Sequence, residues 1–144
     1  KKVSKFDKDL QELVQDMVET MLQAEGVGLA APQVGVPQRV VVIQLPEDDD
    51  HPQAGQLFVL VNPEILSLSE ETEAGDEGCL SIPNIFGEVE RARQVTVQAQ
   101  NSRGKHIQLT VDGFLARAFQ HEIDHLDGIL ITDRATKIRR ETEK

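Results

Sequence analysis

The sequence predicts an α+β fold, with a mainly antiparallel sheet packed around a central helix and another helix at the N-terminus. Three observations lead to this prediction. Apolar residues recur at spacings of three and four near both ends of the chain, which is the period of a helix. Between these segments, apolar residues alternate with polar ones or form short β-branched runs, which is typical of strands. The order helix, strands, helix favours antiparallel pairing, and we expect one domain over residues 1–144 because no linker or internal repeat interrupts the chain.

The N-terminal helix is predicted from a single apolar face. The members of this face lie three or four residues apart: Leu10, Leu13, Val14, Met17, Val18, Met21 and Leu22. Asp7 precedes the pattern and is a typical N-cap residue. Gly26 follows it, where the end of a helix often needs a left-handed residue.

Runs of aliphatic and β-branched residues predict the first strands of the sheet. These runs occupy residues 39–45 (RVVVIQL), 57–62 (LFVLVN) and a shorter stretch at 65–68. Two acidic segments, residues 46–56 and 69–76, are expected to be loops. His51 lies in the first of them and is expected on the surface.

A hairpin with one solvent-facing side is predicted after these strands. Apolar and polar residues alternate along both of its arms, which places the apolar ones on the covered face. They are Val95, Val97 and Ala99 on one arm, and Ile107, Leu109 and Val111 on the other. Residues 101–104 (NSRG) connect the two arms.

The second helix is predicted over residues 113–126, with Asp112 as its cap. Residues at helical spacing share one of its faces: Phe114, Ala118, His121, Glu122 and His125. Other faces carry Arg117, Gln120 and Asp124. The side chains that could bind a metal therefore share a face with residues expected to point inward.

Residues 121–125 contain the pattern H-E-x-x-H. Two histidines four residues apart lie one turn apart on the same side of a helix, so that both can reach one ion. The glutamate beside the first histidine then faces water at that ion. This pattern predicts a metal site made by His121 and His125, with Glu122 as general acid/base.

A catalytic metal site usually has a third protein ligand. No histidine follows His125 at the spacing that one group of zinc proteases uses, and Glu141 and Glu143 lie in the charged tail. Cys79, the single cysteine, is the better candidate, since a thiolate with two imidazoles suits zinc and ferrous iron. The alternative is a small buried thiol without a chemical role.

A glycine-rich segment at residues 26–35 supplies two further candidates. Gly28 would let the backbone approach a ligand closely, and the amide of Gln33 could donate to a developing oxyanion. The alternative for this segment is a tight connection between a helix and a strand.

Three segments together resemble the signature motifs of bacterial-type peptide deformylases. They are residues 26–33 (GVGLAAPQ), 77–81 (EGCLS) and 120–125 (QHEIDH), in that family's order and at similar spacings. The resemblance implies an enzyme that removes the formyl group from the N-formylmethionine of nascent polypeptides and releases formate. It also implies that Cys79, His121 and His125 hold one divalent metal ion, Fe2+ in the cell, with Zn2+ and Ni2+ also suited to the site.

The resemblance further implies a role for each neighbouring group. Water at the ion would attack the formyl carbon with Glu122 as general acid/base, while Gln33 and the backbone N–H of Leu80 stabilise the oxyanion. The methionine side chain of the substrate would lie against an apolar group of residues: Val27, Gly28, Phe114 and Ala118.

The charge of the chain bears on its partners. A net charge of −10 argues against DNA or RNA as the main substrate. The tail from residue 134 to 144 has five basic and two acidic residues, a net charge of +3. Its composition favours a solvated helix end over a contact for an anionic surface. Some members of the family resembled above dock on the ribosome through a longer basic helix, and the tail is compatible with such a contact.

Other expectations concern location and assembly. No apolar run is long enough for a membrane span, and we expect a cytoplasmic monomer. The chain does not begin with Met, and it lacks the strand-like segment that precedes the first helix in the family, so a preceding segment carrying an organellar address is also compatible with it. Two alternative functions are a zinc endopeptidase with Glu141 as third ligand, and a binding module without turnover.

Overall fold

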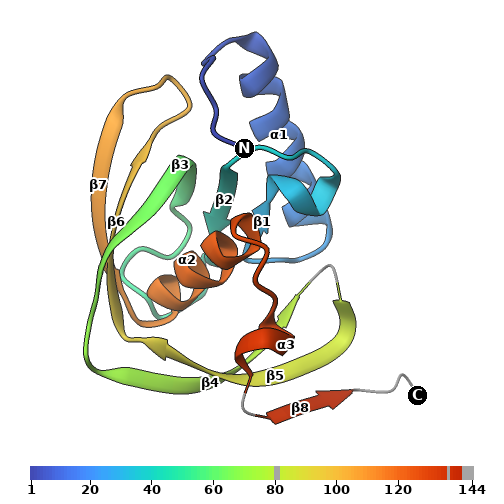
Figure 1. Ribbon diagram of the computed structural model, residues 1–144, viewed down its shortest axis with the longest axis vertical. Helices are drawn as coiled ribbons and strands as arrows, with labels where there is room; N and C mark the ends of the chain where they lie inside the picture. The colour runs from blue at the N-terminus through green and yellow to red at the C-terminus, as the bar shows by residue number, and fades with distance from the viewer. Residues whose placement is uncertain (80–81, 136, 141–144) are drawn as a thin grey trace.

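The computed structural model describes residues 1–79, 82–135 and 137–140 (Figure 1). Two main helices and a mostly antiparallel set of strands confirm the α+β prediction. No helix in this described part of the chain is long and apolar enough to cross a membrane. The elements, in chain order, are α1 (Lys8–Gln23), β1 (Gly28–Ala30), the 3-10 helix η1 (Ala31–Val34), β2 (Val40–Gln44), β3 (Leu57–Leu68), β4 (Thr72–Cys79), β5 (Ile82–Ala92), β6 (Gln94–Gln100), β7 (His106–Asp112), α2 (Gly113–Leu126), α3 (Ile131–Arg134) and β8 (Lys137–Arg140).

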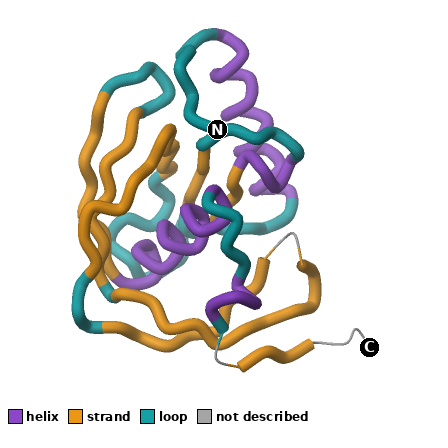
Figure 2. Tube along the Cα trace, viewed as in Figure 1, coloured by secondary structure: helices purple, strands orange, loops and turns teal. Residues whose placement is uncertain are grey.

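The strands form two sheets around α2. The larger sheet has the order β1-β2-β3-β6-β7 and the smaller one the order β4-β5-β8, with every neighbouring pair antiparallel. Helix α2 contacts β1, β2, β6 and β7 of the larger sheet and β5 of the smaller one. It lies in the middle of the strands in Figures 1 and 2, so its side chains meet protein in most directions.

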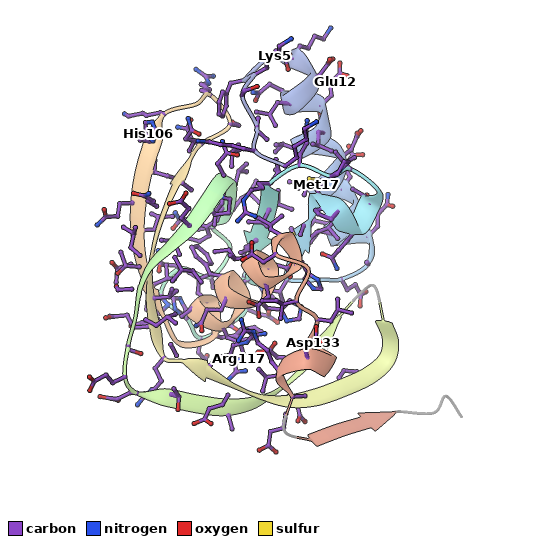
Figure 3. All side chains as sticks on the ribbon, viewed as in Figure 1. Lys5, Glu12, Met17, His106, Arg117 and Asp133 are labelled. Atoms are coloured by element: carbon purple, nitrogen blue, oxygen red, sulfur yellow. The ribbon has the colours of Figure 1, made fainter. Side chains whose placement is uncertain are left out.

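Helix α1 covers the outer side of the larger sheet. Leu10, Met17 and Met21 are buried between it and the strands, and Figure 3 labels Met17 at this contact. The side chain of Asp7 accepts a hydrogen bond from the N–H of Leu10 at 3.2 Å, which confirms the predicted cap. The left-handed residue at the other end is Glu25, with φ of 55°, and not the expected Gly26. Leu22 is exposed because it lies at the margin of the apolar face.

The strand predictions were correct for the centre of the larger sheet and wrong at one loop. Residues 57–62 and 65–68 belong to one continuous strand, β3, whose pairing with β6 shifts register between Val61 and Glu64. The acidic segment at 69–76 was expected to be a loop, but most of it forms β4, paired with β5. Its acidic side chains did not prevent a strand because Glu70, Glu71, Glu73 and Asp76 are all exposed to solvent.

The predicted hairpin is formed by β6 and β7, and the apolar residues of its two arms lie opposite one another. Val95 pairs with Val111, Val97 with Leu109, and Ala99 with Ile107. These residues meet Leu115 and Phe119 of α2 in the main hydrophobic cluster of the protein. Phe119 also makes an edge-to-face contact with Phe58, with ring centroids 5.3 Å apart. The cluster therefore fixes α2 against the larger sheet.

Helix α2 begins and ends where the sequence predicted. Asp112 is its N-cap residue, although its side chain makes no capping hydrogen bond. Instead, Nε2 of His51 lies 3.0 Å from the carbonyl oxygen of Asp112. The expectation that His51 is a surface residue was wrong, because the loop folds back on the start of α2 and leaves only 9% of the imidazole exposed.

The residues after α2 that the structure describes form no long solvated helix. The short helix α3 ends at Arg134, and β8 then adds to the smaller sheet by pairing with β5. Residues 141–144 and the side chains of β8 lie outside the described residues. Contact of this tail with the ribosome therefore stays a prediction.

Candidate active site

Two imidazoles face each other on α2. His121 and His125 are four residues apart, and their Nε2 atoms lie 3.1 Å apart with the rings at 69° to one another. Both residues are buried, with 9% and 8% of their surface exposed. Two nitrogens each 2.0–2.1 Å from one tetrahedral ion would be roughly 3.3 Å apart. The separation of these two nitrogens is therefore close to what a shared ion requires.

The other ring nitrogen of His121 is oriented by a carboxylate. Nδ1 of His121 lies 2.8 Å from Oε1 of Glu77, which comes from β4. A carboxylate that accepts a proton from Nδ1 leaves Nε2 as the nitrogen that can bind a metal, and such carboxylates are common behind metal-binding histidines. The pairing of Glu77 with His121 and the arrangement of the two rings therefore both leave Nε2 as the nitrogen of His121 that could bind an ion.

Glu77 remains ionised because two arginines surround it. Arg91 binds both of its carboxylate oxygens, at 3.0 Å and 2.8 Å, and Arg117 binds one of them at 2.5 Å. Burial alone would raise the pKa of Glu77, but hydrogen bonds from His121 and Arg91 and the charge of Arg91 lower it to about 2. A full negative charge therefore stands behind His121 and favours its role as a donor ligand.

Asp124 extends this set of charges along α2. One of its oxygens accepts hydrogen bonds from Arg91 and from Arg134, each at 2.5 Å. Burial alone would lower the pKa of Arg91, but its bonds to Glu77 and Asp124 raise it. Helical spacing predicts that Gln120 and Asp124 lie away from the inward face, and it indicates no role for either residue. Both are buried because protein surrounds α2 on several sides, and a periodic pattern cannot reveal that.

Glu122 lies between the paired imidazoles and the glycine-rich segment. Its side chain is 7% exposed, and its Oε2 lies 3.9 Å from Nε2 of His121. A Cβ atom on Gly28 would come within 2.7 Å of the same carboxylate oxygen. The missing side chain at residue 28 therefore makes room for Glu122. Strand β1 places Gly28 beside this carboxylate.

The carbonyl end of the Gln33 amide is held by the backbone. Its Oε1 accepts a hydrogen bond from the N–H of Ala30 at 2.8 Å, within the single turn of η1. The other end of the amide is then the nitrogen, which is a donor. This orientation is the one that a role in stabilising an oxyanion requires.

The structure describes only the backbone of Cys79, and it does not describe Leu80. The backbone of Cys79 ends β4, two residues after Glu77. Its side chain, and the whole of Leu80, lie outside the described residues. Within the described part of the chain no group of three metal-binding side chains is found. The donors that are described, two imidazoles beside a buried carboxylate, fit a zinc or ferrous ion in their chemistry.

The apolar candidates separate into two environments. Val27 and Ala118 pack in the main hydrophobic cluster around α2. Phe114 lies on the first turn of the same helix and is 46% exposed. The structure thus associates Val27 and Ala118 with one hydrophobic cluster and places Phe114 at the surface.

Fold and site together define a class of protein, a hydrolase with an H-E-x-x-H helix inside an antiparallel α+β fold. Residues 1–141 match the model of the polypeptide deformylase family, so the chain belongs to the peptide deformylase family. Its curated relatives are named peptide deformylase. It is therefore an enzyme, a hydrolase that acts on the N-formyl amide bond, and the family is metal-dependent.

Two relatives and two solved structures illustrate the similarity. Peptide deformylase 1 of Bacillus cereus is 54% identical over 142 residues, which are 99% of this chain and 86% of the relative. The peptide deformylase of Thermotoga maritima is 46% identical over 140 residues, 97% of this chain and 80% of the relative. The crystal structure of the T. maritima enzyme superposes with a TM-score of 0.86 at 45% identity, covering 95% of this chain and 88% of that one. The Met-Ala-Ser-bound structure of the class I type b enzyme of Acinetobacter baumannii superposes with a TM-score of 0.86 at 42% identity. The match covers 93% of this chain and 88% of that one.

Proposed function

We propose that this chain removes the formyl group from the N-terminal formylmethionine of nascent polypeptides and releases formate. The observation that carries the proposal is the placement of Glu122. Its buried carboxylate lies beside the paired imidazoles of α2, and the bare backbone of Gly28 leaves it room. A carboxylate at that position can exchange protons with a small acyl group and its attacking water.

Cys79, His121 and His125 would hold one divalent ion, with Fe2+ as the ion in the cell. Zn2+ and Ni2+ suit the same donors. When bound, the ion supplies Lewis-acid polarisation and makes water a stronger acid. Support on the protein side comes from Glu77, whose bond to Nδ1 orients the first of the two imidazoles.

Glu122 would act twice in the reaction. As a general base it takes the proton of the water that attacks the formyl carbon. As a general acid it then gives a proton to the amine nitrogen as the carbon–nitrogen bond breaks. Both transfers occur inside a largely buried site, where the 7% exposure of the Glu122 side chain limits exchange with bulk water.

Gln33 and Leu80 would stabilise the negative charge on the formyl oxygen. The amide nitrogen of Gln33 is the donor because the amide oxygen is held by Ala30. The backbone N–H of Leu80 would be the second donor. Two donors aimed at one developing oxyanion are the usual arrangement for acyl transfer.

The methionine side chain of the substrate would lie against Val27, Gly28 and Ala118, with Phe114 at the entrance. Val27 and Ala118 share one apolar cluster, whereas Phe114 is half exposed, which suits a residue that a peptide meets first. The A. baumannii relative binds Met-Ala-Ser, a peptide that begins with methionine.

The experiment that tests this proposal is formate release from formyl-Met-Ala-Ser by protein purified without oxygen. Metal content is determined on the same sample, and acetyl-Met-Ala-Ser serves as the matched control peptide. We expect turnover of the formyl peptide, with about one metal ion per chain. A folded, metal-loaded protein that releases no formate would overturn the proposal and favour a binding role.

A further inference from the structure

A line of charged side chains connects the short helix α3 to the imidazole of His121. We propose that Arg134, on α3, is a positioning residue for His121. It acts through three intervening side chains, Asp124, Arg91 and Glu77. The inference rests on the proposed function in one respect, because it takes His121 to be a metal ligand.

The outer half of this line is a shared carboxylate. Arg134 binds Asp124 with two nitrogens, Nε to Oδ2 at 2.5 Å and Nη2 to Oδ1 at 2.9 Å. Nη1 of Arg91 binds the same Oδ2 atom, also at 2.5 Å. Two guanidinium groups thus divide one carboxylate between them, and the position of one constrains the position of the other.

The inner half repeats this arrangement. Arg91 binds Glu77 with two nitrogens, and Oε1 of Glu77 accepts from Nη2 of Arg91 at 2.8 Å. The same Oε1 atom lies 2.8 Å from Nδ1 of His121. A movement of the Arg91 guanidinium is therefore transmitted to the oxygen that orients the imidazole.

The inner side chains of this charged line are buried, which restricts their movement. Arg134, at its outer end, is accessible to solvent. The side chains of Arg91, Glu77 and Asp124 are each less than 10% exposed, whereas that of Arg134 is 44% exposed. Helix α3 contacts β4 and β5 of the smaller sheet, and Figure 3 shows it, with Asp133 labelled, beside these strands. Because Arg134 belongs to α3, the docking of this helix is connected to the site.

The charges along the line explain why removing the guanidinium of Arg134 would change the hydrogen bond between Glu77 and His121. With Arg134 present, Asp124 has two cationic partners and Glu77 has Arg91 and Arg117. Without it, Asp124 depends on Arg91 alone among these arginines. Arg91 would then be drawn toward Asp124 and away from Glu77, and the hydrogen bond to His121 would change in length and strength.

The test compares Arg134→Met with Arg39→Met in the zinc-loaded protein. Arg39 is a matched control because its Nη1 donates to Oδ1 of Asp127 at 3.0 Å. Asp127 is the C-cap residue of α2, three residues after Asp124. Its other side-chain bond goes to the carbonyl oxygen of Pro63, away from Glu77. The first readout is the proton resonance of Nδ1–H of His121 in protein with 15N-labelled histidine. The second is the rate at which zinc passes to a chelator in excess.

We expect Arg134→Met to move the His121 resonance and to speed the loss of zinc about threefold or more. This is less than the 10- to 100-fold effect typical of a residue bonded directly to a metal ligand. Arg39→Met should leave both readouts at their wild-type values. Arg134→Lys, which keeps the charge but only one hydrogen bond, should fall between wild type and Arg134→Met, and it serves alone if the methionine variant does not fold.

The inference is overturned if folded Arg134 variants keep the wild-type resonance and the wild-type rate of zinc loss. A merely structural role of Arg134 would lower the unfolding temperature without moving the resonance. His121→Ala separates this result from failure of the proposed function. If His121→Ala keeps zinc as well as wild type does, the ligand assignment is wrong; if it loses zinc while Arg134→Met behaves like Arg39→Met, only this inference fails.

Discussion

Gly28 and the carboxylate of Glu122 are in direct apposition: a Cβ atom at residue 28 would stand 2.7 Å from Oε2 and 2.8 Å from Cγ of Glu122. Real Cβ contacts are almost never that short, so a larger residue would displace the carboxylate. The backbone of Gly28 has no positive φ angle, and alanine would be compatible with its conformation. The glycine is therefore required by the space around Glu122.

Gly28→Ala is expected to lower kcat roughly 100-fold while the protein keeps its metal, because a misplacement of about 1 Å at a reacting group costs about that much. Steady-state kinetics on formyl-Met-Ala-Ser, with metal analysis on the same protein, would check this. A variant with unchanged kcat would show that Glu122 has room to move aside without harm.

Glu122→Gln is expected to retain the metal and to lose about 10²- to 10⁴-fold in kcat, the usual contribution of a general acid/base. Glu19→Gln, on the exposed face of α1, is the control for a surface glutamate and should behave as wild type does. Full activity of Glu122→Gln would remove this residue from the proton transfers.

Cys79→Ala is expected to lose the metal, while Glu141→Gln should keep it. The thiolate is the proposed third ligand, and Glu141 is the third ligand only under the endopeptidase alternative. Metal content of both variants, measured after gel filtration in a metal-free buffer, decides between the two. Loss of metal from Glu141→Gln alone would favour the endopeptidase alternative.

Glu77→Gln is expected to weaken metal binding 10- to 100-fold, because it removes the charged partner of His121. It also leaves Arg91 and Arg117 without their shared carboxylate in a buried position, which should cost about 3–5 kcal/mol of unfolding free energy. Chelator competition and urea unfolding measure the two effects separately. Equal metal affinity in variant and wild type would count against the assignment of Nε2 as the donor.

His51→Ala is expected to lower the unfolding free energy by about 1–3 kcal/mol without changing the metal content. The imidazole accepts a hydrogen bond from the N–H of Gln53 at 3.0 Å, and its other nitrogen lies 3.0 Å from the carbonyl oxygen of Asp112. It therefore joins the acidic loop to the start of α2. His106, exposed on β7 and labelled in Figure 3, is the control, and His106→Ala should change stability by less than about 0.5 kcal/mol. Equal stability of the two variants would contradict the bridging role.

Much of the fold was predictable because its signals are local. The period of α1 and its Asp7 cap, the alternation along β6 and β7 and the bounds of α2 all follow from side-chain spacing within a single element. The strand β4 was missed for the same reason. Its acidic sequence resembles a loop, and only pairing with β5 makes it a strand.

The sequence by itself determined the class of fold, the family and the residues proposed for the site, because the H-E-x-x-H spacing and the three motifs are properties of order along the chain. Only the tertiary structure decided what surrounds those residues. Glu77 lies 44 positions from His121, and Arg91 lies 33 positions from Asp124. Contacts at such separations depend on how β4, β5 and α2 pack together, and no periodic pattern encodes them. The charged support of the site therefore became visible only when the chain was folded.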